Sequence, residues 1–469
     1  RRERELRSKQ GRGFRYWEQY IASMSCLSCW SFLWDIMPDT RHLPITLPET
    51  EGCQRIENRI CDLPDDLLLR ILYFVPTKEA FATAILSKRW RPVWTMLPEL
   101  TFKDEGSESL GRFIEESLKL HKAPKLQSLI VELGPRCLVN VDVGKWVENA
   151  VDRGVEYLQF YLLWSAEPTR FPKSLYTCET LVRLTLSNKI LVDVSSLARL
   201  PSLLSLRLLC VVYKDEGSLV KLLSSSPVLQ HLTVERHKDD KVTNFTVKVS
   251  SLQTLFYYWK DEDEDDDDLF GSLVIDSPAL TKLDLFGVWE DCLIENMPCL
   301  DVSSIGCVHN PNENFLRSLS SVKHLKFFLT KSMVACCNAI HFSRLTEFRF
   351  FPYISVDWLE PFMLLLQNSP KLKTLTIETV DPGGLPPSWN QPSSVPGCLS
   401  SHLEIFRWSY YEGREVGKQL LSYILANSKC LKTVEIFMET CNLEEKRKEI
   451  ESMPRISTSS RLLFPTVLE

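Results

Sequence analysis

A short leucine pattern recurs along most of this chain and limits what the chain can fold into. The pattern L-x-x-L-x-L, with other large apolar residues replacing some leucines, starts first at Leu126 and last at Leu431. Successive copies start 22 to 31 residues apart, except for a gap of 42 between Leu280 and Val322. A degenerate copy, LDVSSI at Leu300, divides that gap into 20 and 22 residues. This spacing predicts an array in which each turn contributes one short strand and a return segment.

The return segments also resemble one another. LLSSSPVLQHL, LLQNSPKLKTL and ILANSKCLKTV each predict a helix end, a polar break and the start of the next strand. A turn with a single apolar edge can bury that edge only by stacking on its neighbours. The sequence therefore predicts an α/β protein, an irregular solenoid with a parallel sheet on its inner face, and the spacing is typical of leucine-rich repeats.

The side chains between the leucines of each strand are expected to point away from the core. Repeat arrays usually present such positions as an extended binding surface, although a scaffold without a fixed partner stays an alternative. The charges at these positions are mixed, so they do not specify the charge of the partner. The candidates for binding a target are Arg183, Thr185, Arg207, His231, Thr233, Lys282, Asp284, Lys323 and Lys326.

A helical segment precedes the repeats. Pro64 suits the start of a helix, and Asp65 and Asp66 suit its first turn, where negative charge favours the helix dipole. Leu67–Val75 is apolar almost all round, with Arg70 as the only strongly polar residue. Such a helix needs two partners for burial, and a module of about fifty residues has little core of its own. Its second face either docks another protein or is covered by the repeats; the pattern alone favours neither.

The segment LSKRWRPVWTMLP places Trp90 and Trp94 four residues apart among three cations. Aromatic and basic residues in this arrangement can stack on nucleic-acid bases, or the rings can pack inside a helical module. The formal net charge is −6, and Asp261–Asp268 supplies eight of the negative charges, so the rest of the chain is nearly balanced. No basic field indicates a nucleic-acid partner.

The segment LPDDLLLRILYFVPTKEAFATAILSKRWRPVWTMLPELTF resembles an F-box of the form common in plant proteins. The matching marks are L-P-D-D-L-L, P-T-K, L-S-K-R-W-R and L-P-x-L-x-F, in the correct order. The resemblance implies a three-helix module that binds the Skp-type adaptor of an SCF (Skp–cullin–F-box) ubiquitin ligase. It assigns adaptor binding to eight positions, the last two of which also fill the core of the module or its border: Leu63, Pro64, Ile71, Leu72, Val75, Pro76, Leu86 and Trp90.

A second resemblance lies near the end of the chain. Trp389–Phe437 contains W-x-x-P-x-x-V-P-x-C-L, L-E-x-F, Y-x-G and Y-I-L-x-N-S, and is similar to the FBD domain that follows the F-box and leucine-rich segments of many plant proteins. The resemblance implies further repeats and an end-cap, and Asn442–Ile450 predicts a polar closing helix. We expect an N-terminal extension over 1–55, disordered or absent from the natural product, an F-box over 56–104, leucine-rich repeats over 105–388 and an FBD-like cap over 389–463.

Sequence motifs for catalysis are missing. Gly413–Gln419 lacks the glycine spacing and the Ser or Thr of a phosphate loop, and neither G-x-S-x-G nor H-E-x-x-H occurs. Fifteen cysteines without a regular framework indicate free thiols, and the pair Cys26 and Cys29 has no second pair at zinc-ligand spacing. We therefore expect no catalytic residue, cofactor, metal or membrane partner, and a nuclear and/or cytoplasmic location.

Together these features predict the substrate-receptor subunit of an SCF-type ubiquitin ligase. The F-box would dock the Skp-type adaptor, and through it a cullin, while the repeats would hold an unknown target protein. The alternative is a leucine-rich-repeat scaffold or sensor without ligase activity.

Overall fold

The structure is a computed structural model. The predicted extension over 1–55, the pair Cys26 and Cys29, and the acidic run Asp261–Asp268 lie outside the residues that it describes. The described residues are 63–465, without 87, 105, 107–108, 138–140, 164–166, 238–239, 241, 261–270, 296, 312, 353–356, 380–388, 390, 393 and 439–442.

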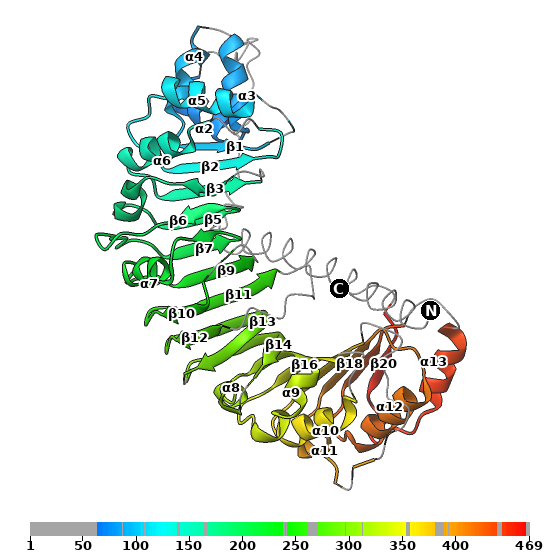
Figure 1. Cartoon of the computed structure of the whole chain (residues 1–469). Helices are drawn as coiled ribbons and strands as arrows, with labels where there is room; N and C mark the ends of the chain where they lie inside the picture. Colours follow the sequence, from blue (N-terminus) through cyan, green and yellow to red (C-terminus); the bar gives the residue numbers. More distant parts are fainter. Residues whose placement is uncertain are drawn as a thin grey trace, which may run out of the picture. The chain divides into compact units, whose positions relative to one another are not determined.

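Short helices open the described part of the chain (Figure 1). They are α2 (Asp65–Tyr73), α3 (Thr77–Ala82) and α4 (Trp90–Val93). A 3-10 turn follows α3, namely η2 (Thr83–Ile85), and another follows α4, namely η3 (Trp94–Met96). The predicted start of the first helix is confirmed, because α2 begins directly after Pro64 with two aspartates in its first turn.

The hydroxyl of Thr77 ties α3 to the first strand. Thr77 is the first residue of α3, but Pro76 occupies the N-cap position and no side chain caps the helix. Instead, the Thr77 hydroxyl accepts a hydrogen bond of 2.8 Å from the backbone N–H of Thr101 in β1 (Glu99–Phe102). Thr77 therefore joins the helical module to the sheet.

Parallel strands follow one another through the rest of the described chain. Each strand of the series pairs in parallel with the one before it, which confirms the predicted sheet, and the degenerate copy at Leu300 leads into a genuine strand, β14. The series is β1, β2 (Ser128–Leu133), β3 (Tyr157–Leu162), β5 (Arg183–Ser187), β7 (Ser205–Leu209), β9 (His231–His237), β11 (Thr254–Lys260), β13 (Lys282–Ile294), β14 (Val302–Asn310), β15 (His324–Leu329), β16 (Glu347–Pro352), β17 (Thr374–Glu378), β18 (Ile405–Ser409), β19 (Thr433–Ile436) and β20 (Arg461–Leu463).

Additional strands lie beside this series. β10 (Asn244–Lys248) pairs with β12 (Ser272–Asp276), and β12 pairs with the second half of β13, so the long strand β13 belongs to both ladders. A separate small sheet joins β4 (Thr169–Arg170), β6 (Ile190–Val192) and β8 (Val212–Tyr213). These strands arise from segments without the leucine motif.

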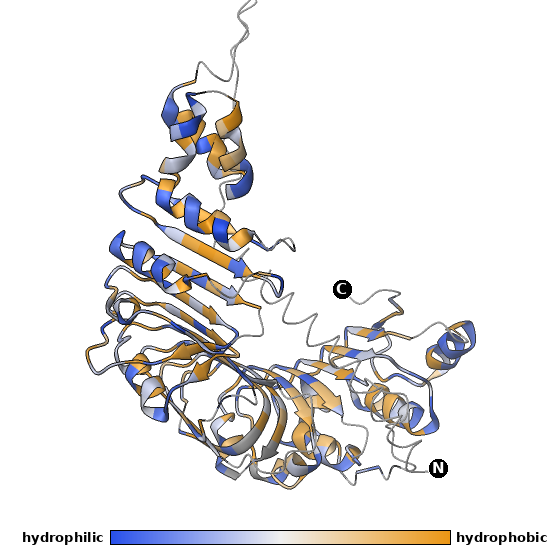
Figure 2. Ribbon diagram, turned by 45° about the horizontal axis from the view of Figure 1, so that its top comes forward, coloured by the Kyte–Doolittle hydropathy of each residue, from blue (hydrophilic) through white to orange (hydrophobic). Residues whose placement is uncertain are grey.

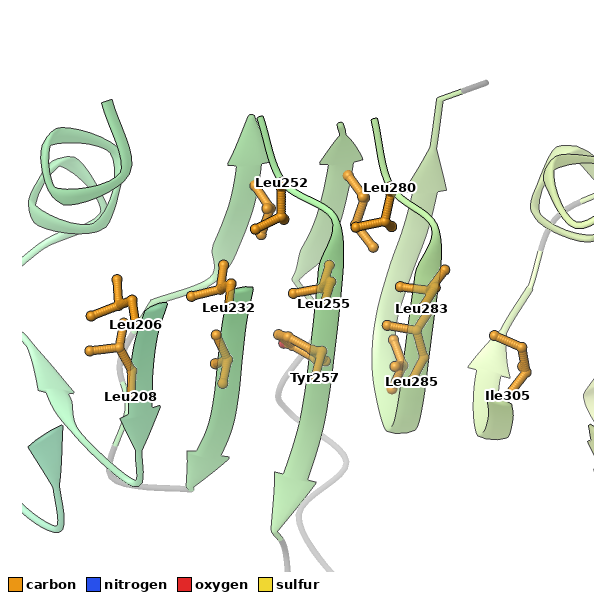
Figure 3. Close-up of a cluster of buried hydrophobic side chains, with 14 of the residues drawn as sticks. Leu206, Leu208, Leu232, Leu252, Leu255, Tyr257, Leu280, Leu283, Leu285 and Ile305 are labelled. Carbon is orange, nitrogen blue, oxygen red and sulfur yellow. The ribbon is translucent and has the colours of Figure 1, made fainter. Parts of the chain in front are cut away.

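The motif leucines form the core of the sheet. In the middle of the series Leu232, Leu255 and Leu283 are in register on neighbouring strands, and all of them are fully buried. Figure 3 shows the same arrangement for Leu252 and Leu280, which precede their strands and continue the stack. Stacking neighbouring turns thus removes from water the apolar edge that a single turn would expose.

Helices lie on one side of the sheet, where α6, α7, α8, α10 and α12 are visible in Figure 1. Within the described residues, none of the helices combines the length and the apolar character needed to span a membrane. The remaining helices and turns are α5 (Leu110–Leu120), α6 (Val143–Asp152), η4 (Lys173–Thr177), α7 (Glu216–Ser224), α8 (Glu313–Ser318), α9 (Lys331–Val334), η5 (Cys337–Ala339), α10 (Leu359–Gln367), α11 (Gly397–Ser401), α12 (Glu415–Asn427) and α13 (Leu443–Ser452).

A buried serine marks the predicted break after α7 and after α10. The hydroxyl of Ser226 donates to the carbonyl of Leu222, at 2.9 Å, and that of Ser369 donates to the carbonyl of Leu365, at 2.6 Å. Both serines are fully buried, so these bonds satisfy carbonyls that the helix ends would leave without a partner. The polar break therefore ends each helix inside the core and lets the chain turn into the next strand.

The end of the described chain closes the series. The predicted polar helix is present as α13, and its sequence is hydrophilic along most of its length, as the blue helix at the far right of Figure 2 shows. Ile450 is its buried residue, and Leu443 and Met453 pack against the core beside it. The strand β20 then pairs with β19, so the last motif strand does not end the sheet.

Candidate functional site

Helix α2 carries two apolar stripes with different surroundings. Leu68 and Leu72 are buried in the core of the chain. The exposed stripe consists of Leu67, which precedes Leu68, and Ile71, which precedes Leu72. These two residues are also four positions apart, so they lie on one face of the helix. The sequence left open whether the repeats cover the second apolar face of this helix, and among the described residues the second face stays uncovered.

Exposed apolar residues are concentrated in this module. Eight of the nineteen large exposed apolar side chains of the described chain fall between positions 67 and 96. Phe74 is 83% exposed, Ile85 88% and Leu86 68%. Because soluble proteins seldom expose apolar side chains in groups, such a group usually marks a surface that binds another protein. The eight are Leu67, Ile71, Tyr73, Phe74, Val75, Ile85, Leu86 and Met96.

The residues assigned to adaptor binding divide between this surface and the core. Leu72 and Trp90 are each only 2% exposed, so they pack inside the module and leave the surface to their neighbours. Leu63 is half-buried against the same core. The others of the set are exposed, namely Pro64, Ile71, Val75, Pro76 and Leu86. Leu86, which we expected in the core or at its border, is therefore a surface residue, and the adaptor contact itself stays a prediction.

Arg89 fixes the start of α2. Its guanidinium forms an ion pair with Asp65, with Nη2 and Oδ1 2.8 Å apart, and also donates a hydrogen bond to the carbonyl of Leu63. Arg89 thus joins the end of the module to its first helix, so it positions the exposed stripe.

The two tryptophans are packing residues, as the resemblance implied. Trp90 and Trp94 are both buried, and the ring of Trp94 lies edge-on to that of Phe81, with centroids 5.0 Å apart. Phe81 in turn contacts Phe113 of α5, at 5.1 Å. This chain of rings holds the helical module against the first repeat.

The second candidate site is the face of the sheet that points away from the helices. The third and fifth positions of each L-x-x-L-x-L motif face this side, and the parallel register aligns them into two rows. The third-position row contains Ser128, Tyr157, Arg183, Ser205, His231, Thr254, Lys282, Val302, His324, Glu347, Thr374, Ile405 and Thr433. The fifth-position row contains Ile130, Gln159, Thr185, Arg207, Thr233, Phe256, Asp284, Ser304, Lys326, Arg349, Thr376, Arg407 and Glu435.

The structure brings all but one of the predicted target-binding residues into these rows. Arg183, His231 and Lys282 belong to the third-position row. Thr185, Arg207, Thr233, Asp284 and Lys326 belong to the fifth-position row, although Thr185 is itself buried by its neighbours.

Lys323 is the exception. It precedes β15, and its ammonium forms an ion pair of 3.0 Å with Asp301. Its position corresponds to the second position of the motif, which lies outside the rows. Lys323 therefore lies outside the rows, and His324 takes the corresponding place beside Val302. The part of Lys323 in target binding stays a prediction.

The rows also contain charged residues that the sequence analysis missed. Arg349 pairs with Glu378, with Nε and Oε1 3.0 Å apart, and Arg407 pairs with Glu435, at 2.6 Å. Both arginines occupy the fifth motif position, so alignment of the motif copies with one another would have found them. The face thus carries ion pairs that run across neighbouring strands.

Two charged residues in the middle of the fifth-position row, Asp284 and Lys326, have shifted pKa values. Burial raises the pKa of Asp284, although its carboxyl accepts hydrogen bonds from Tyr258 and Ser304. Burial also lowers the pKa of the Lys326 ammonium, and the neighbouring charge of Arg349 lowers it further. Both ions are therefore partly withdrawn from water. Within the described residues, no group of three or more His, Cys, Asp and Glu is placed to hold a metal ion.

Family models match three parts of the chain. The F-box domain model matches residues 60–101, and the FBD model matches residues 391–436. Between them, a model described as "FBD-associated F-box protein At5g56370, LRR repeats" matches residues 143–312. The order of the three matches agrees with the order of the helical module, the repeats and the closing segment.

Similar proteins of Arabidopsis thaliana match along nearly the whole length. "Putative F-box/FBD/LRR-repeat protein At1g22000" is 67% identical over 454 residues, which cover 93% of this chain and 97% of that protein. "Putative FBD-associated F-box protein At1g05080" is 47% identical over 439 residues, 89% of this chain and 98% of that protein. "F-box/FBD/LRR-repeat protein At4g26340" is 38% identical over 424 residues, 87% of this chain and all of that protein. On this evidence, the chain belongs to the F-box/FBD/LRR-repeat protein family.

Proposed function

We propose that this F-box protein is the substrate-receptor subunit of an SCF-type ubiquitin ligase. Its F-box would bind a Skp-type adaptor, and through it a cullin, while the rows of the sheet would bind a target protein. The observation that carries the proposal is the exposed stripe of α2, because it lies within the F-box and leaves apolar side chains in contact with water.

The chain would contribute no acid, base or nucleophile to the transfer of ubiquitin. A receptor accelerates the reaction by holding a target lysine near the ubiquitin-carrying enzyme, which replaces a bimolecular encounter by an intramolecular one. This role suits a nuclear and/or cytoplasmic location, where the other subunits would be met.

Capture of a purified plant Skp-type adaptor by the full-length chain tests the proposal. The informative variant is the double substitution Ile71→Ala and Leu86→Ala, because both side chains are exposed and their loss leaves the core intact. We expect the parent to capture the adaptor and the double variant to bind at least about tenfold more weakly, as for residues central to an interface.

Leu197→Ala is the matched control, since Leu197 is an 80% exposed leucine within the repeats. It should bind the adaptor as the parent does. A folded parent that captures no adaptor would contradict the receptor proposal and favour a leucine-rich-repeat scaffold. A double variant that binds as tightly as the parent would show that the adaptor docks elsewhere.

A further inference from the structure

Two cations lie side by side on the row face of the sheet. Lys326 of β15 and Arg349 of β16 are directly opposite each other in the parallel register. Like charges at such positions are destabilising unless a negative charge compensates them. Arg349 has its own carboxylate, Glu378. The ammonium of Lys326 forms neither a hydrogen bond nor an ion pair with any residue that the structure describes, although the carboxylates of Asp284 and Glu378 attract it from farther away.

Other cations of the same region have partners. Arg407 pairs with Glu435, and the ammonium of Lys282 lies over the ring of Phe256, 4.9 Å from its centroid. Lys326 differs because it is half-buried and makes no direct contact of this kind within the described residues, while Asp284 and Glu378 attract it only at longer range. A cation that is partly withdrawn from water and adjacent to a second cation attracts an anion more strongly than a fully solvated one does.

The surroundings of Lys326 limit the charge that can approach. Ser304 lies on the side opposite Arg349, one strand away, and Asp284 lies two strands away, about 10 Å at the ordinary strand spacing. Asp284 receives hydrogen bonds from Tyr258 and Ser304, so hydroxyl groups satisfy it. Its negative charge still opposes a second negative charge in the same region.

Aromatic rings bound the site toward the carboxyl ends of the strands. Phe328 stacks on Phe351, with centroids 4.1 Å apart, and Phe286 meets Phe328 edge-on, at 5.8 Å. These rings reduce the access of water from that direction and so strengthen electrostatic contacts beside them.

We propose that Lys326, with Arg349 beside it, receives the carboxylate of an aspartate or glutamate side chain of the target protein. The inference rests on the proposed function, in which the rows hold the target. The ammonium has no carboxylate in direct contact, so there is room beside it for one negative charge. A phosphate dianion fits less well, because Arg349 is already paired and Asp284 repels additional negative charge.

Peptide libraries provide the test. Random octapeptides are immobilised in three versions that differ only at one fixed central position, which is glutamate, glutamine or phosphoserine. The full-length parent should retain the glutamate library at least about tenfold better than the glutamine library. Lys326→Gln should abolish this preference without loss of thermal stability, because the substitution also removes a repulsion between two cations.

Lys323→Gln is the matched control, since this lysine of the same repeat is already paired with Asp301. It should keep the parent's preference for glutamate. Equal retention of the glutamate and glutamine libraries by the parent would overturn the inference, as would an unchanged preference in Lys326→Gln or an equal loss in Lys323→Gln. A preference for phosphoserine that depends on Lys326 would overturn the assignment to a carboxylate.

Adaptor capture, measured on the same proteins, separates this inference from the proposed function. Lys326→Gln should capture the adaptor as the parent does. A chain that prefers glutamate through Lys326 but captures no adaptor would refute the ligase role and leave the carboxylate site standing. A chain that captures the adaptor without a preference for glutamate would refute the carboxylate site alone.

Discussion

His121 is a buried residue whose hydrogen bonds define its protonation state. Its Nδ1 lies 2.6 Å from Nη1 of Arg153, and its Nε2 lies 2.8 Å from the carbonyl oxygen of Leu97. A guanidinium only donates, so Nδ1 accepts and Nε2–H donates to the carbonyl, which requires the neutral ring. The residue thereby joins the end of the F-box to the end of α6.

Acidification should weaken this junction. Burial, and then the charge of Arg153, lower the pKa of His121 from its ordinary value of 6.5, while the ring of the unfolded chain keeps that value. The stabilising contribution is therefore complete above pH 6.5 and decreases as the pH falls from there toward the lowered pKa. Thermal midpoints at pH 7.5 and 5.5 should differ more for the parent than for His121→Gln. Equal differences would contradict this account.

Gly306 of β14 allows two aromatic rings to meet over the sheet. A Cβ atom at this position would overlap the ring of Phe286 and lie 3.0 Å from Cδ2 of Phe328. Gly306→Ala should therefore lower the free energy of unfolding by about 1–3 kcal/mol, as overpacking does. Gly397→Ala serves as the control in the same urea titration, because no atom lies within 4 Å of its added Cβ. A comparable loss at both glycines would contradict the steric explanation.

At the scale of single elements, α2 separates stability from binding. Leu68→Ala should lower the free energy of unfolding by about 2–5 kcal/mol, because it leaves a cavity in the core. Leu67→Ala makes the same chemical change one residue away, on the exposed stripe, and should change it by less than about 0.5 kcal/mol. Denaturant unfolding of both variants measures the difference, and equal costs would show that the two stripes are buried alike.

The motif strands could be predicted from sequence because the leucine spacing fixes both their location and their pairing. The strands β10 and β12 could not, since NFTVK and SLVID lack the motif and depend on the second half of β13 for a partner. The apolar pattern alone could not identify the exposed stripe of α2, because both stripes are apolar and only tertiary contacts distinguish them. The resemblance to an F-box named Ile71 of this stripe, but also the buried Leu72. Lys323 shows how a shift of one position along the chain places a residue outside the rows, although it too lies between the apolar residues of its motif.

At the scale of the whole molecule, each turn is stabilised by its neighbours, so the last turn needs a cover. A chain that ends at Ile436 lacks α13 and β20 and leaves β19 as an unpaired edge. Such an edge can pair with another chain. The truncated protein should therefore self-associate and melt at a lower temperature, as light scattering and thermal denaturation would show. A monomer with an unchanged midpoint would mean that α13 and β20 contribute nothing to the cover.

The in-register rows set the spacing between contacts for any polypeptide segment that binds across the strands. Neighbouring members of a row are separated by the distance between strands, about 4.8 Å, whereas an extended polypeptide advances about 3.3 Å per residue. Two strand-to-strand distances therefore equal the length of three residues of a bound segment. The backbone of the segment returns to the same place relative to a strand only at that interval. Because the side chains of an extended segment alternate between its two faces, side chains that meet equivalent positions recur about every six residues, four repeats apart. Inserting a single residue into the segment would put every later contact out of phase.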